Sequence, residues 1–196
     1  MVKIVLASGS KIRAILLKNA GVGFKVQAAD IDENKLRQAM ATKPIHPKKM
    51  SYILALEKAL NVSALVKNSY VIGADQLLVA QEKIFEKPGT EKKAVQQLLE
   101  LAGKTHQLWT SCVVVKDGKE RWHYTAKASI TLASLSPAFI KGYIKRNPWV
   151  VNCVGSYQLE GEGIQFFQKI RGDYFSILGL PLHPLILFLK KELLLR

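Results

Sequence analysis

A serine-rich turn near the N-terminus joins an apolar segment to a predicted helix. Ser8-Gly9-Ser10 follows the apolar residues 2–7, and Arg13 falls in the first turn of a helix expected over residues 11–20. Backbone N–H groups at a helix N-terminus bind anions, and an arginine adds a bidentate cationic donor. The turn is therefore a candidate phosphate site. A Ser-capped helix with a solvated arginine is the alternative, and the segment matches neither a Walker A loop nor GxGxxG.

Acidic residues form a second group of candidates. Asp75 directly follows the apolar run 70–74, so we expect it at the carboxyl end of a buried strand, where α/β proteins bind ligands. An aspartate in that place can hold a divalent metal ion or accept a proton from water. Asp30, Asp32 and Glu33 could supply a second metal ligand. The alternatives are a turn residue for Asp75 and a solvated loop for the cluster.

Lysines and a glycine-rich segment complete the candidates. Lys58 lies on a predicted helix, and Lys87 precedes Pro88-Gly89 after a predicted hairpin. Either could contact phosphate, but a single lysine in a lysine-rich chain is by default a surface residue, so the case depends on the group. The segment 155–163 has three glycines and carries Glu160, which could face a base or a metal ion, or could lie in a plain surface loop.

The elements that must position these residues alternate between strands and helices. We expect strands at 2–7, 24–28, 70–74, 77–79, 84–85, 107–115 and 121–132, and helices at 11–20, from about 50 into the 60s, from the Thr90 cap to Gly103, at 136–145 and after 184. The turn Lys116-Asp117-Gly118-Lys119 predicts a hairpin between the last two strands. Early alternation followed by a hairpin predicts an α/β fold with a mixed sheet.

Length and composition restrict the class of protein. The chain has 196 residues, 48% of them hydrophobic and 22% charged. This suits one folded domain, or at most two small lobes that share one core, and excludes extensive disorder. The formal net charge is +14, from 29 Lys and Arg against 15 Asp and Glu. Nucleic acid, an anionic membrane surface or a small polyanion such as a nucleotide would each suit that charge.

The cysteines and the chain ends exclude several other classes. Cys112 and Cys153 form no CxxC pair and have no histidine at zinc spacing, so we expect two reduced thiols and no structural zinc. The N-terminal apolar run is too short for a signal-peptide core, and Lys190 interrupts the C-terminal one. We therefore expect a cytoplasmic protein that does not insert into a membrane.

Several short motifs occur along nearly the whole chain in the order typical of one protein family. They are Leu6-Ala7-Ser8-Gly9-Ser10 with Arg13, Asp32-Glu33, Ala55 with Lys58-Ala59, Ile72-Gly73-Ala74-Asp75-Gln76, Lys87-Pro88, Gly155-Ser156-Tyr157 with Glu160-Gly161, and Gly179-Leu180-Pro181-Leu182. Together they resemble the Maf family of nucleoside triphosphate pyrophosphatases. The resemblance implies a single domain over residues 1–196, with an elongated, two-lobed α/β fold and a deep central cleft, related to the inosine triphosphatases and often dimeric.

The resemblance also implies a reaction and a site. Family members cleave a nucleoside triphosphate between the α- and β-phosphates to give a monophosphate and pyrophosphate. Asp75 would be the proton acceptor that activates water, and Glu33 would join it in placing a divalent metal ion. Mg²⁺ is expected because phosphates and one or two carboxylates suit its octahedral oxygen preference, with Mn²⁺ as the alternative. The residues implied to hold the triphosphate are Ser8, Arg13, Lys58 and Lys87.

Substrate choice in this family resembles a division between a dTTP/UTP group and a 7-methyl-GTP group. The first usually carries S-P-R-R at the opening and G-A-D-T in the centre, whereas this chain has Ser10-Lys11-Ile12-Arg13 and Gln76. These residues and Glu160, which could meet the guanine edge, place the chain nearer the 7-methyl-GTP group. Ile12 stands where that group often has an aromatic residue, so stacking on a methylated base is not predicted.

Two other hypotheses remain at this point. The net charge of +14 would suit a nucleic-acid-binding or septum-regulating protein with little catalysis, although the chain has no RNP, helix-turn-helix or zinc-finger signature. A catalytically idle family member that only binds nucleotide is the other. The retained Asp75, Glu33 and Lys87 favour an active pyrophosphatase over an idle family member.

Overall fold

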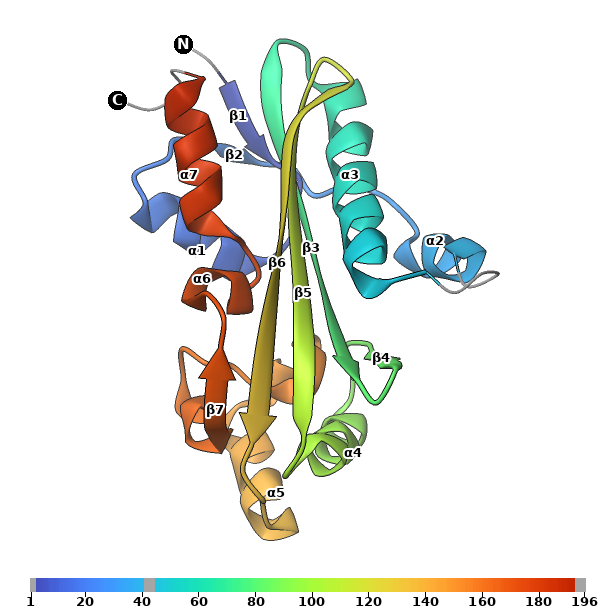
Figure 1. The fold of residues 1–196 in the computed structure, drawn as a ribbon, viewed down its shortest axis with the longest axis vertical. Helices are drawn as coiled ribbons and strands as arrows, with labels where there is room; N and C mark the ends of the chain where they lie inside the picture. Colours follow the sequence, from blue (N-terminus) through green and yellow to red (C-terminus); the bar gives the residue numbers. More distant parts are fainter. Residues whose placement is uncertain (1–2, 41–44, 193–196) are drawn as a thin grey trace. The chain divides into compact units, whose positions relative to one another are not determined.

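A computed structural model describes residues 3–40 and 45–192, in which helices and strands alternate as expected (Figure 1). The strands are β1 (Lys3–Leu6), β2 (Lys25–Val26), β3 (Ser69–Ala80), β4 (Lys83–Phe85), β5 (Thr105–Lys116), β6 (Lys119–Leu132) and β7 (Phe167–Arg171). The helices are α1 (Lys11–Asn19), α2 (Glu33–Met40), α3 (Pro47–Leu65), α4 (Glu91–Leu101), α5 (Pro137–Arg146), α6 (Tyr174–Ile177) and α7 (Leu182–Lys191). Three short 3₁₀ turns, η1 (Pro148–Asn152), η2 (Val154–Ser156) and η3 (Glu162–Phe166), lie between α5 and β7.

The strands form a mixed sheet. They hydrogen bond in the order β2-β1-β3-β5-β6-β7, and β4 pairs with β3 beside that path. β1 runs parallel to β2 and β3, whereas β4 on β3 and β7 on β6 are antiparallel. The predicted α/β fold with a mixed sheet is therefore confirmed.

The chain divides into two compact units. Unit 1 comprises Met1–Gln76, Thr110–Ala126 and Asp173–Arg196, and unit 2 comprises Leu77–Trp109 and Lys127–Gly172. None of the helices within residues 3–40 and 45–192 is both long and apolar enough to cross a membrane.

Unit 1 has helices on both faces of its strands. Alternate residues of a strand point to opposite faces, and β1 shows this directly. Leu6 packs in a core cluster with Leu17 of α1 and Leu189 of α7, whereas Val5 packs in a second cluster with Ala59 of α3. Figure 1 shows α3 on one side of β3 and α1 with α7 on the other. Both faces are apolar because each is covered.

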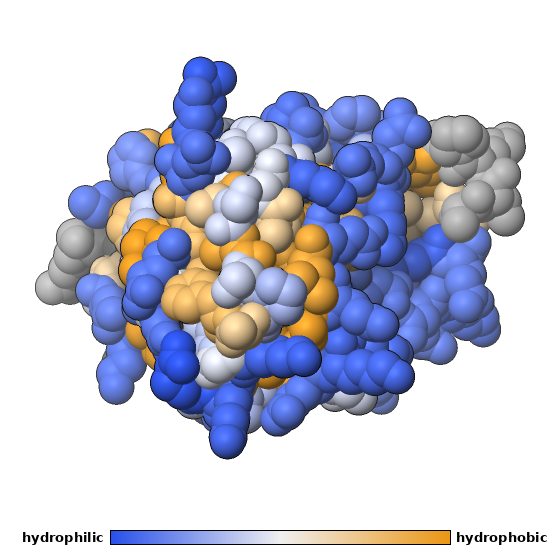
Figure 2. All heavy atoms as spheres, turned by 90° about the horizontal axis from the view of Figure 1, so that it is seen from below, coloured by the Kyte–Doolittle hydropathy of each residue, from blue (hydrophilic) through white to orange (hydrophobic). Residues whose placement is uncertain are grey.

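Unit 2 contains two helices with side-chain N-caps and a buried hydrogen bond between two polar side chains. The Thr90 side chain caps α4 by accepting from Lys93 N–H, as predicted, and the Ser136 side chain caps α5 by accepting from Phe139 N–H. His106 is 1% exposed, and its Nε2 lies 2.6 Å from the hydroxyl of Tyr157. Seen from the end that carries α5, unit 2 shows a patch of hydrophobic side chains bordered by hydrophilic ones (Figure 2).

Several element boundaries differ from the sequence expectation. The strands expected at 70–74 and 77–79 are one continuous strand, so Asp75 lies within β3 and not at its end. The helix expected from about residue 50 begins at Pro47, because the His46 ring accepts from Lys48 N–H at the cap position. Ser10 occupies the cap position of α1, but its side chain makes no capping hydrogen bond.

Candidate active site

The turn after β1 is held by serine and arginine side chains. β1 ends at the buried Leu6, and α1 begins five residues later. Ser8 is buried, and its hydroxyl oxygen accepts from Ser10 N–H at 3.3 Å and from Arg13 Nη1 at 3.1 Å. The serine that structures this helix start is therefore Ser8, and its hydroxyl faces the guanidinium of Arg13.

Arg13 connects three segments that are distant in sequence. Its Nε donates to the carbonyl oxygen of Gly179 at 2.7 Å, and its Nη1 donates to the carbonyl oxygen of Ala74 at 2.8 Å as well as to Ser8. Burial lowers the pKa of Arg13 and the Asp75 carboxylate opposes that shift. An arginine remains protonated in either case. Arg13 is thus a partly buried cation that ties the Ser8 turn to β3 and to the loop before α7.

Close packing between α3 and β3 brings Lys58 to Asp75. A β-carbon on Gly73 would stand 2.2 Å from the carbonyl oxygen of Ala55 and 2.9 Å from the backbone nitrogen of Ala59, so only glycine permits this approach. Lys58, one helical turn along α3 from Ala55, places its Nζ 2.7 Å from Oδ1 of Asp75. Lys58 is 8% exposed and Asp75 is 4% exposed. The two residues form a buried ion pair.

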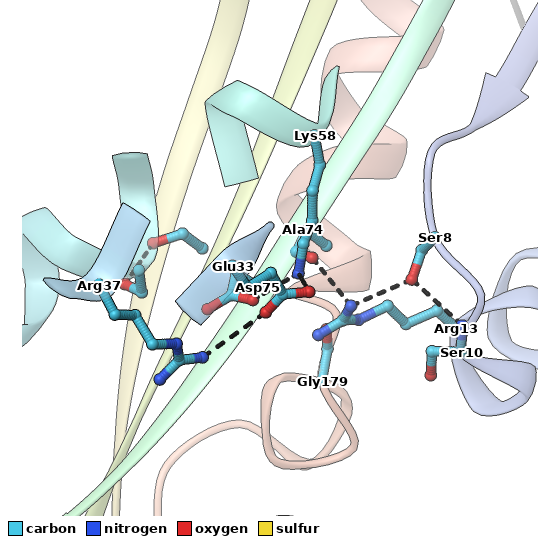
Figure 3. A network of polar contacts seen from close by, with 11 residues as sticks. Ser8, Ser10, Arg13, Glu33, Arg37, Lys58, Ala74, Asp75 and Gly179 are labelled. Carbon is cyan, nitrogen blue, oxygen red and sulfur yellow. Dashed lines mark hydrogen bonds and ion pairs between the residues drawn. The ribbon is translucent and has the colours of Figure 1, made fainter. Parts of the chain in front are cut away.

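Glu33 reaches the same lysine from a third element. It is the first residue of α2, and its Oε1 lies 2.9 Å from Nζ of Lys58. Its Oε2 lies 3.6 Å from Nη2 of Arg37, one turn further along the helix. Figure 3 shows Glu33, Lys58 and Asp75 converging, with Arg13 and Arg37 on opposite sides of them in that view.

The second carboxylate oxygen of Asp75 is left for a ligand. Its Oδ2 is buried and has no hydrogen-bond partner among the described residues. An unpaired buried carboxylate oxygen is costly, so such an atom indicates a water, ion or substrate group that binds there. Glu33 and Asp75 both contact the Lys58 ammonium, so these two carboxylates fit an oxygen-preferring divalent ion whose other ligands are phosphate oxygens and water. Within residues 3–40 and 45–192, the structure has no group of three or more His, Cys, Asp or Glu side chains that could hold a metal ion.

Gln76, the residue after Asp75, is anchored by its amide. Its Nε2 lies 2.8 Å from Oγ1 of Thr110 and 3.0 Å from the carbonyl oxygens of both Ser176 and Ile177. Thr110 itself donates to the carbonyl oxygen of Ser176 at 2.8 Å. The amide nitrogen therefore holds α6 against β3 and β5.

The structure brings five of the predicted site residues together within unit 1: Ser8, Arg13, Glu33, Lys58 and Asp75, with Gln76 next to Asp75 in the chain. The Ile12 side chain is partly buried against the α1–α7 core cluster. Lys87 and Glu160 belong to unit 2, where both side chains are exposed. Burial raises the pKa of the Cys153 thiol; the Glu160 carboxylate raises it further and Lys87 lowers it, so both residues lie near that thiol.

Some site contacts were not predicted from the sequence. The carbonyl oxygens of Ala74 and Gly179 bind Arg13, but a backbone carbonyl carries no residue-specific signal. Arg37 pairs with Glu33 through an i,i+4 spacing on α2, and that spacing is visible in the sequence once the helix is assigned.

Comparison with known proteins gives a family match over almost the whole chain. The family model described as Maf-like protein matches residues 3–192. The chain is 44% identical over 192 residues to a protein of Brucella abortus named 7-methyl-GTP pyrophosphatase, covering 97% of this chain and 96% of that one. It is 43% identical over 189 residues to a protein of Paramagnetospirillum magneticum named nucleoside triphosphate pyrophosphatase, covering 96% and 97%.

Solved structures give a more distant similarity. A nucleoside-triphosphatase, also named dITP/XTP pyrophosphatase, from Mycobacterium abscessus aligns with a TM-score of 0.42 and 11% identity, covering 98% of this chain and 96% of that one. A HAM1 protein from Coxiella burnetii aligns with a TM-score of 0.41 and 14% identity over 69% and 75%.

Proposed function

The chain belongs to the Maf family, and from that premise we propose that it is a nucleoside triphosphate pyrophosphatase. It hydrolyses a nucleoside triphosphate to the monophosphate and pyrophosphate. The observation that carries the proposal is the Asp75 carboxylate, which has one oxygen on the Lys58 ammonium and one buried oxygen with no hydrogen-bond partner in the described part of the chain. That arrangement suits a group that takes a proton from an attacking water beside a cationic phosphate site.

Asp75 is assigned as the proton acceptor. Lys58 fixes the carboxylate through Oδ1, so Oδ2 is the atom that would accept a hydrogen bond from the water that attacks the α-phosphorus. The water's proton would pass to Oδ2 as the oxygen–phosphorus bond forms, and pyrophosphate would leave on the opposite side. The burial of Asp75 keeps competing solvent away from this atom.

Cationic and hydroxyl groups are assigned to the triphosphate. Arg13 has two nitrogens occupied by protein acceptors, which leaves Nη2 as its donor toward a phosphate oxygen. The Ser8 hydroxyl contacts Arg13 and the Lys58 ammonium contacts Asp75, and both groups are assigned to the triphosphate. Lys87 of unit 2 is assigned to it through the family motif. Positive charge around the reacting phosphorus stabilises the charge that develops on its oxygens.

Glu33 and Asp75 would hold a divalent metal ion, expected to be Mg²⁺ with Mn²⁺ as the alternative. When bound, such an ion neutralises phosphate charge and orients the triphosphate. Two carboxylates and the phosphate oxygens form the donor set that Mg²⁺ prefers. Removal of divalent ions with EDTA is expected to stop pyrophosphate release, and added Mg²⁺ or Mn²⁺ to restore it.

A modified guanine nucleotide is the first candidate substrate. A relative named 7-methyl-GTP pyrophosphatase is 44% identical to this chain, which supports 7-methyl-GTP. Ile12, Gln76 and Glu160 are the residues assigned to base selection. Because the Gln76 amide nitrogen is bound within the protein, we expect its carbonyl oxygen to be the atom that meets the nucleotide.

A nucleotide panel tests the function. The protein is incubated with Mg²⁺ and each of 7-methyl-GTP, GTP, dTTP, UTP and ITP, and released pyrophosphate is measured as phosphate after treatment with inorganic pyrophosphatase. We expect release from at least one nucleotide, loss of it in Asp75→Asn, and normal release in Glu82→Gln, which changes an exposed carboxylate of unit 2. No release from any triphosphate, or full activity of Asp75→Asn, would contradict the proposal.

We further propose a cytoplasmic homodimer. Light scattering coupled to size exclusion would measure the mass in solution, and a mass of one chain would reject the dimer. Nucleic-acid binding is the alternative function, and the net charge of +14 is what favours it. Tight, steeply salt-dependent binding of duplex DNA together with a silent nucleotide panel would favour that alternative.

A further inference from the structure

The two carboxylates that could hold a metal ion already share a cation supplied by the protein. Nζ of Lys58 lies 2.7 Å from Oδ1 of Asp75 and 2.9 Å from Oε1 of Glu33. An ammonium group at these distances satisfies one oxygen of each carboxylate. Lys58 therefore occupies the place between the carboxylates that a divalent ion would need.

The charges around this place are unfavourable for a free cation. Glu33 and Asp75 contribute two negative charges, whereas Lys58, Arg13 and Arg37 contribute three positive ones. Arg37 pairs with Glu33, and the carboxylates of both Asp75 and Glu33 act on the Arg13 guanidinium. Lys58 and Asp75 are buried, while Glu33, Arg13 and Arg37 are partly buried. Charges this close interact, so a free Mg²⁺ or Mn²⁺ ion would enter a region with a net positive charge.

The same net positive charge attracts a triphosphate that already carries its metal ion. Such a chelate is still negatively charged, so the three cations attract it as a whole. Once phosphate oxygens are present, the Lys58 ammonium has alternative acceptors and can leave one or both carboxylates. Oδ1 of Asp75 and Oε1 of Glu33 then become available to the ion that the nucleotide brings, whereas Oδ2 of Asp75 stays available to the attacking water.

We propose that the free protein has little affinity for divalent metal ions, because Lys58 acts as a resident counter-cation, and that the metal ion enters only as a chelate with the triphosphate. This inference rests on the proposed function and specifies its substrate as the metal–nucleotide complex. Lys58 is then a positioning residue that alternates between carboxylates and phosphate.

Binding of Mn²⁺, followed by electron paramagnetic resonance, tests this without turnover. The nucleotide-free protein is titrated with Mn²⁺ alone and again with the α,β-methylene analogue of GTP present, which cannot be cleaved at the α–β bond. We expect bound Mn²⁺ only with the analogue, beyond the Mn²⁺ that the analogue binds in a protein-free sample. Equal Mn²⁺ affinity of the free protein and the complex, or no protein-bound Mn²⁺ with the analogue, would overturn the proposal.

A variant pair tests the role of Lys58 itself. Lys58→Met removes the resident cation and is expected to raise the Mn²⁺ affinity of the nucleotide-free protein about tenfold or more, since a positive charge next to both carboxylates is lost. Lys83→Met is the matched control, because Lys83 also pairs with a carboxylate, that of Glu100 at 2.8 Å, but in unit 2 and in exposed surroundings. An equal gain in both variants, or none in Lys58→Met, would overturn the role of Lys58.

The two proposals fail in different measurements. Pyrophosphate release from the nucleotide panel does not depend on the order in which metal and nucleotide bind. The wild-type titration with Mn²⁺ alone depends neither on turnover nor on the folding of a variant. An active enzyme that binds Mn²⁺ tightly without nucleotide would reject this inference and leave the proposed function standing.

Discussion

The backbone of Gly73 approaches the carbonyl oxygen of Ala55 so closely that a β-carbon on Gly73 would lie 2.2 Å from that oxygen. This contact sets the distance between β3 and α3. Lys58 and Asp75 project from these two elements, and their ion pair depends on that distance.

Gly73→Ala is therefore expected to separate α3 from β3. The added methyl group should cost about 1 to 3 kcal/mol of the free energy of unfolding, as overpacking commonly does, and should lower kcat by displacing Lys58 from Asp75. Urea unfolding and pyrophosphate release measure the two effects. Gly23→Ala is the control, because a β-carbon there has no neighbour within 4 Å and its stability change should stay within about 1 kcal/mol. Similar stabilities of the two variants would contradict the prediction.

Arg13→Lys tests whether the hydrogen bonds of Arg13 to Ser8, Ala74 and Gly179 stabilise the protein. A lysine has one nitrogen and cannot donate to Gly179, Ser8 and Ala74 together, so buried acceptors would lose their partner. We expect a loss of about 2 kcal/mol or more in the free energy of unfolding, together with lower kcat/KM. Arg121→Lys changes an exposed arginine 3.8 Å from Glu192 and should cost less than about 1 kcal/mol. If chemical denaturation gives both variants the same midpoint, the buried connection is not needed for stability.

Gln76→Glu replaces an amide donor by a carboxylate of the same shape. The new oxygen would face the carbonyl oxygens of Ser176 and Ile177, so the folded state would disfavour its charged form and raise the pKa of the new carboxyl group. We expect a loss of about 2 kcal/mol in the free energy of unfolding at pH 7. Relative to the wild type, the variant should regain stability as the pH falls and this carboxyl group protonates.

Urea unfolding at pH 7 and pH 5 checks this prediction as a difference between the variant and the wild type. Gln168→Glu changes an exposed residue of β7, so its free energy of unfolding should match that of the wild type at both pH values. If the free energy of unfolding of Gln76→Glu is below that of the wild type by the same amount at both pH values, the new carboxylate is not held against the carbonyl oxygens.

His106 should make the stability of the protein depend on pH. Burial lowers its pKa from 6.5 to about 4, so the folded state keeps the ring neutral while the unfolded state takes up a proton between those values. Because the unfolded state binds more protons in this window, stability is full above about pH 6.5 and is lost as the pH falls toward 4. The loss attributable to this group is about 3 kcal/mol.

Unfolding of the wild type and His106→Gln between pH 4.5 and 7.5 measures that contribution. The variant should be less stable at pH 7, where it loses the contact with Tyr157, but its stability should fall less steeply toward low pH. His183→Gln changes an exposed histidine of α7 and should leave the wild-type slope unchanged. Equal slopes in the wild type and His106→Gln would place the pH dependence elsewhere.

Much of the site could be predicted because its side chains have distinctive types and stand in motifs. Asp75, Lys58, Glu33 and Arg13 were each singled out from the sequence, and the structure places them in one network. The family that these motifs indicated is confirmed by the match over residues 3–192. The α/β fold with a mixed sheet was predicted from the alternation of strands and helices and is also confirmed.

Other features depend on contacts that no local pattern encodes. Asp75 was expected at a strand end, and it does lie beyond the end of β1, whose Leu6 pairs with Ile72. β3 continues past it because β4 and β5 supply further pairing partners. A polar residue inside a strand looks like an interruption of the apolar pattern, so the sequence predicts two strands where the structure has one. The acceptors of Arg13 were missed because backbone carbonyl groups are common to all residues.

The bond from Arg13 to Gly179 has a consequence for how the protein is made. Arg13 emerges early during translation, whereas Gly179 belongs to the last segment of unit 1, after all of unit 2 has been synthesised. The hydrogen bond between Arg13 and Gly179 therefore cannot form until the ribosome has added the intervening residues. Both segments of unit 2 have been synthesised before residue 179 is added, so unit 2 can fold first on the ribosome. The catalytic network would be the last part of the nascent chain to close, and a ribosome stalled before residue 179 would release a polypeptide without it.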